Sequence, residues 1–221
     1  MMVAHHISDE LLLSYASGNL AEGWSLAVAT HLALCPACRH RLFLMEKTAG
    51  QLLVDLAPEP AADGSWERML ARIQSAEGTP TSQPVAVSPA CDEIPILPDP
   101  LRTYLGGDVT SLKWIPLGRG AYHIPIPTMD RKTKARLLRI PAGKPVPEHG
   151  HGGRELTVVL TGSFRDGEEL FARGDIEEAD TSLTHQPIAT PEQDCICLAV
   201  TDAPLRFSNW LLRLVQPALG I

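Results

Sequence analysis

The sequence lacks three features that would point to common classes of protein. Basic residues are not in excess, because 19 lysines and arginines stand against 26 aspartates and glutamates, for a net charge of −7. Proteins that hold nucleic-acid phosphates by charge need the opposite balance, so we expect no direct nucleic-acid binding. No apolar run approaches the roughly 18 residues that span a membrane, and the opening residues lack the basic-then-apolar pattern of a secretory signal. We therefore expect a cytoplasmic protein without a membrane partner.

The cysteines do not form an even set, which argues against a framework of disulfides. There are five: Cys35, Cys38, Cys91, Cys195 and Cys197. In a reducing compartment, cysteines that lie close together in the sequence more often bind a metal than each other. The pair at positions 35 and 38 is the one whose surroundings are most informative.

The first third of the chain has the pattern of a helical module. Ser8, followed by Asp9 and Glu10, is typical of a helix start, where a hydroxyl caps free amides and carboxylates favour the positive end of the dipole. Gly18 would end this helix, and Pro36 suits the first position of a later one. Further helices are predicted over residues 21–34, over 36–56 and around 66–73.

The predicted third helix carries an apolar stripe on an otherwise polar rod. Its members recur at steps of three and four residues and are Leu42, Met45, Ala49, Leu52 and Leu56. The short helix around Trp66 repeats this spacing with Met69, Leu70 and Ile73. Such stripes cover a partner surface, either inside the protein or on another molecule.

The remainder of the chain has a different pattern. Repeated prolines in residues 79–100 forbid a continuous helix or central strand and predict a linker. Beyond it, short apolar runs separated by Gly, Pro and Asp predict many short strands. The sequence therefore predicts a multidomain α + β protein: a helical domain over 1–78, the linker over 79–100, and an all-β barrel domain over 101–221.

The segment HLALCPACRH has the spacing of a metal site. His31 precedes Cys35 by four residues, and Cys38 follows three later, so a helix, a break and a new helix can aim all three at one point. Zinc prefers four tetrahedral nitrogen or sulfur ligands, and the nearest further ligand is the pair His5 and His6. We take His6 as the fourth ligand, with His5 as the alternative.

Two other interpretations of this segment stay open. The cysteines and the histidine could merely fill the interior of a helical bundle. A redox pair of the thioredoxin kind would need a strand before Cys35, where the pattern is helical. The small size of the helical module favours a metal, since a domain of this length gains stability from one.

Together with its upstream pattern, this segment resembles the zinc-binding anti-sigma factors of the ChrR type. The upstream pattern HHxSDxxLxxYxxG is formed by His5, His6, Ser8, Asp9, Leu12, Tyr15 and Gly18. The resemblance extends over nearly the whole chain and is weakest in the linker, where Cys91 lies. It implies a zinc ion in the helical domain and, as partner, an extracytoplasmic-function sigma factor that this domain holds away from RNA polymerase.

Residues 143–162, GKPVPEHGHGGRELTVVLTG, match the first sequence motif of the cupins, G-x5-H-x-H-x3-E-x6-G. In a strand His149 and His151 point to the same side, into a barrel, and Glu155 returns from the neighbouring strand after a turn at Gly152 and Gly153. The resemblance implies that His185, in a looser second motif, reaches the same metal. Three imidazoles and a carboxylate suit zinc, iron, manganese or nickel; resemblance to the ChrR type favours a second zinc.

Other interpretations of the cupin region also stay open. The barrel could retain the ligand pattern and yet bind no metal. Cys195 and Cys197 lie two apart on one predicted strand and so share a face, either as small core residues or as a redox pair. Because thiolates and imidazoles oxidise readily, the leading hypothesis is a non-enzymatic regulator.

On that hypothesis the helical domain sequesters a sigma factor. The resemblance implies that the cupin domain senses oxidative stress, as singlet oxygen or organic hydroperoxide, and that the sigma factor is then released. The alternative is a metal-dependent cupin enzyme, such as a dioxygenase, whose helical module only aids assembly. An enzyme would need an open coordination position and a lined pocket, which a sensor does not.

Overall fold

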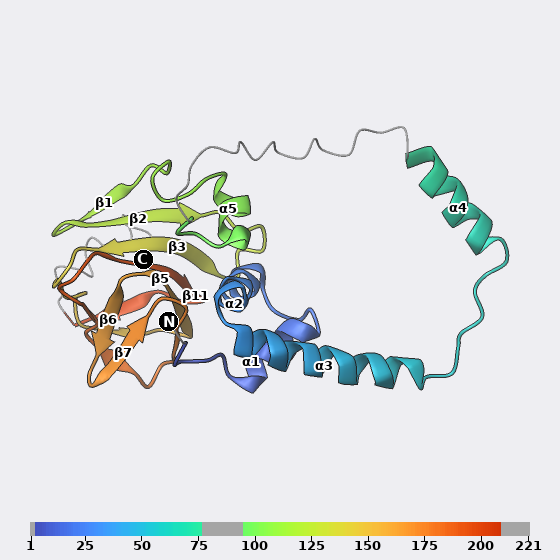
Figure 1. Cartoon of the computed structure of the whole chain (residues 1–221), viewed down its shortest axis with the longest axis horizontal. Helices are drawn as coiled ribbons and strands as arrows, with labels where there is room; N and C mark the ends of the chain where they lie inside the picture. Colours follow the sequence, from blue (N-terminus) through green and yellow to red (C-terminus); the bar gives the residue numbers. More distant parts are fainter. Residues whose placement is uncertain (1–2, 77–94, 209–221) are drawn as a thin grey trace. The chain divides into compact units, whose positions relative to one another are not determined.

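The computed structural model describes residues 3–76 and 95–208 of the chain. Within these ranges five helices precede twelve strands (Figure 1). The helices are α1 (Asp9–Ala16), α2 (Glu22–Leu34), α3 (Pro36–Val54), α4 (Ser65–Ala76) and α5 (Asp99–Leu105). None of the described helices has both the length and the apolar character that a membrane crossing requires.

The strands form three antiparallel sheets. They are β1 (Ile115–Gly118), β2 (Ala121–Ile126), β3 (Lys134–Ile140), β4 (His149–His151), β5 (Glu155–Thr161), β6 (Ser163–Asp166), β7 (Glu169–Ala172), β8 (Ile176–Ala179), β9 (Thr184–His185), β10 (Ile188–Ala189), β11 (Cys195–Thr201) and β12 (Leu205–Phe207). The large sheet has the order β1-β2-β3-β11-β5-β8, and the small ones have the orders β10-β6-β7 and β12-β4-β9.

The sheet order explains how distant segments meet. Strand β11, near the end of the described chain, pairs with β3 on one side and β5 on the other. This crossing makes a jelly-roll sandwich whose sheets do not close into a complete barrel. The predicted fold class, helices followed by an all-β cupin domain of the jelly-roll type, is confirmed.

The helix boundaries follow the local signals in the sequence. The Ser8 hydroxyl accepts a hydrogen bond from the amide of Leu11 and so caps α1. Gly18, just beyond that helix, has a φ of 71°, which a residue with a side chain rarely adopts. Pro36 is the first residue of α3. These starts and stops agree with the prediction.

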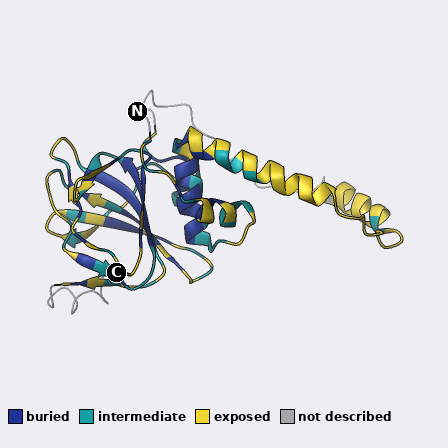
Figure 2. Ribbon diagram, turned by 90° about the horizontal axis from the view of Figure 1, so that it is seen from below, coloured by how far each residue is buried: buried dark blue, intermediate teal, exposed yellow. Residues whose placement is uncertain are grey.

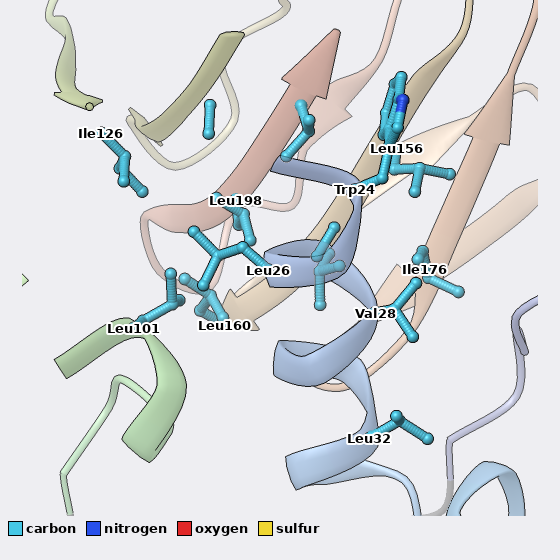
Figure 3. Packing of buried hydrophobic residues seen from close by; sticks show 14 of the residues in the cluster. Trp24, Leu26, Val28, Leu32, Leu101, Ile126, Leu156, Leu160, Ile176 and Leu198 are labelled. Atoms are coloured by element: carbon cyan, nitrogen blue, oxygen red, sulfur yellow. The ribbon is translucent and has the colours of Figure 1, made fainter. Parts of the chain in front are cut away.

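Helix α2 packs directly on the large sheet. Its buried residues Trp24, Leu26 and Val28 belong to the same apolar cluster as Leu156 and Leu198 of the sheet (Figure 3). At Gly23 the backbone approaches β3 so closely that a Cβ atom would overlap the Thr133 hydroxyl, which instead accepts the Gly23 amide hydrogen. The early helices and the sheet therefore share one core.

The chain divides into two compact units. One comprises Met1–Lys47 with Pro95–Ile221, and the other comprises Thr48–Ile94. Most of the predicted linker, including Cys91, lies outside the described residues, and Asp99 and Pro100 at its end begin α5. The domain boundaries at residues 78 and 100 stay a prediction.

Apolar side chains are exposed on the late helices. The cartoon in Figure 2 shows buried residues in the sheet and in the helix against it, and exposed residues along α3. In the second unit the exposed large apolar residues are Leu52, Leu53 and Val54 at the end of α3, Leu56 just beyond it, and Trp66, Met69, Leu70 and Ile73 on α4. The end of the first predicted stripe, from Leu52 onward, and the stripe on α4 therefore lack a covering surface among the described residues of this unit. Leu42 and Met45, at the start of the first stripe, pack against the core of the first unit.

Candidate metal centres

Four side chains from the helical part of the chain meet at one point. His6, His31, Cys35 and Cys38 each offer one atom, and these atoms lie within 4.8 Å of one another. The Nδ1 atom of His6 lies 3.3 Å from the sulfur of Cys35 and 3.5 Å from that of Cys38. The structure thus brings together all four residues predicted for the first metal site.

The local backbone explains this convergence. His31 lies in the last turn of α2, and Cys35 follows with an extended conformation, φ −110° and ψ 101°. The Cys35 amide still donates to the carbonyl of His31, at 2.8 Å, before Pro36 starts the next helix. The break turns Cys38, in the first turn of α3, back toward the histidine.

The neighbouring His5 is engaged elsewhere. Its ring stacks on Phe171, with 4.1 Å between ring centroids. Its Nδ1 atom lies 3.5 Å from the carboxylate of Asp175. Of the two candidate histidines, only His6 faces the cysteines, so the geometry favours His6 over His5 as the fourth donor.

Burial controls the protonation of this cluster. His31 is fully buried, and desolvation lowers its pKa from 6.5 to about 4, so the imidazole is neutral at neutral pH. Neither ring nitrogen has a hydrogen-bond partner of good geometry within the described residues, although the nearby backbone of Gly174 partly offsets the lowering of the pKa. A buried polar group without a partner is costly, and a neutral imidazole with a free nitrogen is what a metal ligand requires. The donor set therefore fits a cation.

The pKa of the Cys38 thiol is higher than the position of this residue in its helix would predict. Its place in the first turn of a helix favours the thiolate. Burial nevertheless raises its pKa above the usual value, although Arg41, 3.5 Å from the sulfur, acts in the opposite direction. The helix terminus alone therefore does not ionise Cys38, and a bound cation would have to do so.

Three imidazoles form a second cluster, in the cupin domain. His149 and His151 lie at alternate positions of β4, and His149 pairs with His185 of β9. The Nε2 atom of His185 lies 3.1 Å from that of His151 and 3.2 Å from that of His149. The structure thus places His185, predicted from the looser motif, beside the two histidines of the first motif.

Glu155 reaches this cluster by a different route from the one expected. Its strand β5 belongs to the large sheet, whereas β4 belongs to a small one. The chain crosses between them at Gly152, where a Cβ atom would lie 2.6 Å from the carbonyl oxygen of Pro204. The Oε2 atom of Glu155 lies 3.4 Å from Nδ1 of His151, on the side of the ring away from Nε2.

Two further carboxylates surround His185, and sequence reasoning missed both. The Oδ2 atom of Asp166 lies 2.8 Å from Nδ1 of His185, and Oε1 of Glu177 lies 3.7 Å from the same nitrogen. Burial favours the neutral imidazole, but hydrogen bonds to these carboxylates outweigh it and raise the pKa of His185. Only the inward-facing position of Glu177 on its strand could have signalled this role.

The buried thiols of the cupin domain lie close to the same cluster. Cys195 and Cys197 line a small cavity of about 70 Å³ that also borders His149 and His185. A hydrogen bond from Cys195 and burial raise the pKa of Cys197 well above its usual value. The thiol of Cys197 therefore stays protonated at neutral pH, which disfavours thiolate chemistry.

Strand β8 and the turn before it join the two clusters. The carboxylate of Asp175 accepts hydrogen bonds from the amides of Ala4 and His5, at 2.6 and 2.9 Å. Glu178 accepts the amide of Ser8 at 2.7 Å. Between these two positions Glu177 faces His185. One short segment therefore contacts both the residues flanking His6 and the imidazoles of the cupin domain.

Comparison with known proteins identifies the family. The model of a ChrR cupin-like domain matches residues 104–204. The chain is 45% identical over 221 residues to the anti-sigma-E factor ChrR of Cereibacter sphaeroides, covering 100% of both. A crystal structure of Rhodobacter sphaeroides SigE in complex with the anti-sigma ChrR matches with a TM-score of 0.78 and 41% identity, over 91% of this chain and 100% of that one. The chain therefore belongs to the ChrR family of anti-sigma factors.

Proposed function

We propose that this protein is a cytoplasmic anti-sigma factor. It binds an extracytoplasmic-function sigma factor, keeps it from RNA polymerase, and releases it under oxidative stress from singlet oxygen or organic hydroperoxides. The observation that carries the proposal is the match over 91% of the chain to a relative that was solved in complex with SigE. No catalytic role is assigned to either histidine cluster.

The exposed apolar faces of the late helices support a protein partner. Trp66, Met69, Leu70 and Ile73 share one face of α4, and all are at least 39% exposed. A contiguous face of this kind is typical of a surface that another protein covers. In helix-in-groove complexes, a helix with this spacing of apolar residues lays them in a hydrophobic groove of its partner, and we propose this mode for α4 and the sigma factor.

In this proposal the helical cluster holds a zinc ion. Two imidazoles and two thiolates, from His6, His31, Cys35 and Cys38, complete a tetrahedral site with no open position. When bound, the metal supplies a crosslink. It ties the segment before α1 to the α2–α3 junction, and so fixes the direction in which α3 leaves toward the sigma factor.

The cupin cluster holds a second metal, for which zinc is the proposal and iron, manganese and nickel are the alternatives. His149, His151 and His185 present their Nε2 atoms to one another. Glu155, the predicted fourth ligand, lies outside this group of three and contacts Nδ1 of His151 instead. Burial keeps the imidazole of His149 neutral by lowering its pKa. This site is proposed as the sensor.

Signal transfer from the sensor is proposed to run through β8. If oxidation alters a cupin ligand, Glu177 no longer has His185 held at the same place. The same strand and the turn before it hold the N-terminal segment through Glu178 and Asp175. A shift of β8 would therefore move the backbone on both sides of His6, and with it the helical cluster.

The direct test is complex formation by the full chain. Mixed with Rhodobacter sphaeroides SigE, or with an extracytoplasmic-function sigma factor from its own source, the metal-loaded protein should elute as a one-to-one complex. It should also suppress transcription by that sigma factor with core RNA polymerase. A loaded chain that leaves both sigma factors free and active would contradict the proposal.

A further inference from the structure

Arg41 contacts the helical cluster without belonging to its predicted ligand set. It follows Cys38 by three residues on α3, so the two side chains share one face of the helix. Its Nη1 atom donates a hydrogen bond to the sulfur of Cys38, at 3.5 Å. The same nitrogen donates to the carbonyl oxygen of Ile7, at 2.9 Å. The guanidinium therefore joins one predicted ligand to the residue that follows another, His6.

Asp9 fixes the direction of this guanidinium. The carboxylate of Asp9, in the first turn of α1, accepts a hydrogen bond from Nη2 of Arg41 and forms an ion pair with it. This hydrogen bond raises the pKa of Arg41, so the guanidinium stays charged at neutral pH. Because Asp9 and Ile7 both hold the group from outside α3, Nη1 remains directed at the sulfur of Cys38.

The two sulfur atoms of the helical cluster receive different hydrogen-bond donors. The sulfur of Cys35 accepts the backbone amide of Cys38, at 3.4 Å, whereas the sulfur of Cys38 accepts a side-chain N–H from Arg41. Burial raises the pKa of Cys38, and the backbone of Ile7 and the charge of Arg41 act in the opposite direction. A substitution can remove the donor of Cys38, which makes its role accessible to experiment.

A cationic donor lowers the reactivity of a thiolate. The hydrogen bond stabilises the negative charge on sulfur, so the lone pairs attack an electrophile less readily. The intrinsic nucleophilicity of a thiolate falls by about threefold when its pKa falls by about one unit, for a Brønsted slope of about 0.4–0.5. An N–H group held against a metal-binding sulfur should therefore slow the oxidation of that sulfur.

We infer that Arg41 is a positioning residue that protects the sulfur of Cys38 from oxidation, with Asp9 holding its guanidinium in place. The inference rests on the metal of the helical cluster in the proposed function, because a bound metal keeps the sulfur deprotonated and so open to attack. It adds a reason why the helical cluster remains intact under an oxidant to which the cupin domain responds.

The reaction that Arg41 slows is oxidation by an organic hydroperoxide. The sulfur of Cys38 attacks the terminal oxygen of the hydroperoxide, and an S–O bond forms as the O–O bond breaks. The sulfur loses two electrons, which leave with the alkoxide, and the alkoxide takes a proton from water. The products are a sulfenic acid at Cys38 and an alcohol.

The first test measures this reaction in the zinc-loaded full chain. The chain is treated with tert-butyl hydroperoxide, and the sulfenic acid at Cys38 is trapped and followed by peptide mass spectrometry. Arg41→Met keeps most of the hydrocarbon that covers the sulfur but has no N–H group, so Cys38 should oxidise at least threefold faster. Arg41→Lys, which retains a cation and N–H donors, should restore most of the protection.

Arg39→Met is the matched control on the same helix. Arg39 is exposed, and its guanidinium donates to the carbonyl oxygens of Leu32 and Ala33 rather than to a sulfur. This change removes the same charge next to Cys38 and should leave its oxidation within twofold of the unchanged chain. An equal acceleration by the changes at Arg39 and Arg41 would attribute the effect to general charge and overturn the inference.

The second test distinguishes a hydrogen bond from simple covering of the sulfur. With cobalt in place of zinc, the charge-transfer absorption from sulfur to cobalt reports the electron density on sulfur. The cupin group of His149, His151 and His185 contains no sulfur and should not contribute to this band. Arg41→Met should move the band to longer wavelength, and Arg39→Met should leave it in place. Faster oxidation with an unmoved band would show that Arg41 only covers the sulfur.

Asp9→Asn provides a second variant if the Arg41→Met chain does not fold. It removes the charge that holds the guanidinium, so oxidation of Cys38 should accelerate and the cobalt band should move, both by less than in Arg41→Met. A loaded chain in which neither quantity changes would overturn the inference and leave the proposed function intact. A chain that holds no zinc at Cys35 and Cys38 would instead contradict the proposed metal site itself.

Discussion

The two histidine clusters differ in what surrounds their nitrogen atoms. In the helical cluster His31 has no hydrogen-bond partner of good geometry on either nitrogen within the described residues, and the thiols of Cys35 and Cys38 complete the set. In the cupin cluster, by contrast, Asp166 and Glu155 lie at the Nδ1 atoms of His185 and His151. A cavity also borders Glu155.

This difference suggests that the helical cluster is a structural metal site, whereas the metal affinity of the cupin cluster depends on its surroundings. Four protein donors without an open position suit a metal that holds a fold. In the cupin cluster a carboxylate lies at the second ring nitrogen of two imidazoles. Such carboxylates orient the ligands and change how tightly they bind a metal, so this site suits a metal whose affinity the surroundings adjust. If the comparison is correct, damage to the first cluster abolishes partner binding, whereas damage to the second changes only the response.

The largest effect is expected from the cysteines. Replacing Cys35 or Cys38 by Ala should remove the metal of the helical cluster and weaken sigma binding at least 100-fold, because the crosslink between α2, α3 and the N-terminal segment is lost. Metal per chain and the affinity for SigE are the measurements. Cys91→Ala, outside both predicted ligand sets, is the matched control. Unchanged sigma binding by the Cys38→Ala chain would remove the distinction between the two clusters.

Replacements in the cupin cluster should separate binding from response. His149→Ala should lower the metal content by one ion per chain, and Glu155→Ala should weaken the same site. Both changes should alter sigma affinity by less than threefold. Release of the sigma factor on exposure to singlet oxygen or tert-butyl hydroperoxide should fall at least tenfold in rate. His40→Ala, at an exposed histidine of α3, should behave as the unchanged chain. A full stress response from the His149→Ala chain would contradict the assignment of the sensor.

Acid should act on the helical cluster through His31. The pKa of this histidine is about 4 in the folded chain and 6.5 in the unfolded one, so protons bind preferentially to the unfolded state between these values. Its contribution to stability is present above pH 6.5 and is lost as the pH falls toward 4. From pH 7 to pH 5 the metal-free chain should lose about 2 kcal/mol of unfolding free energy from this group.

Urea unfolding of the chelator-treated chain at the two pH values measures this loss. His31→Gln should lose about 2 kcal/mol less than the unchanged chain over the same interval, because glutamine does not titrate. His40→Gln, at an exposed position, should lose as much as the unchanged chain. An equal loss in the His31→Gln chain would show that other groups control the acid response.

The same comparison shows what the sequence could and could not predict. His31, Cys35 and Cys38 were predictable because their spacing is local and helix geometry converts it directly into proximity. His149 and His151 were predictable for the same reason on a strand. Asp166 and Glu177 were missed, since they reach His185 through pairings of β6 and β8 with other strands, which no local spacing records.

The core shared by helices and sheet was also not predicted. Proline-rich residues 79–100 suggested two separate domains, yet α2 packs against β5 and β11. A signal existed in α2 itself. Its sequence, EGWSLAVATHLAL, is apolar on nearly every side, with eight of its 13 residues buried, whereas a helix at the surface of a small domain has a polar face. Covering such a helix requires more surface than α1 and α3 provide.

The smallest predicted effect tests the carboxylate behind His185. The carboxylate of Asp166 accepts a hydrogen bond from Nδ1 of His185 and so directs Nε2 of that ring toward His149 and His151. Asp166→Asn keeps an acceptor oxygen but removes the charge, so the affinity of the cupin cluster for zinc should fall about tenfold, or about 1.4 kcal/mol, in chelator competition. Because the carboxylate raises the pKa of His185, the loss should also shift the pH at which zinc is released.

The direction of that shift distinguishes an orienting hydrogen bond from a general loss of stability. Without the carboxylate the pKa of His185 falls, so protons compete less well with zinc for this histidine. The zinc affinity of the variant, although weaker at pH 8, should therefore decrease less as the pH is lowered than that of the unchanged chain. Glu168→Gln, in the same turn but exposed, should change neither quantity. If Asp166→Asn lowered zinc affinity and unfolding free energy in parallel with no change in pH dependence, Asp166 would support only the β6–β7 hairpin, and the carboxylates would no longer distinguish the cupin cluster from the helical one.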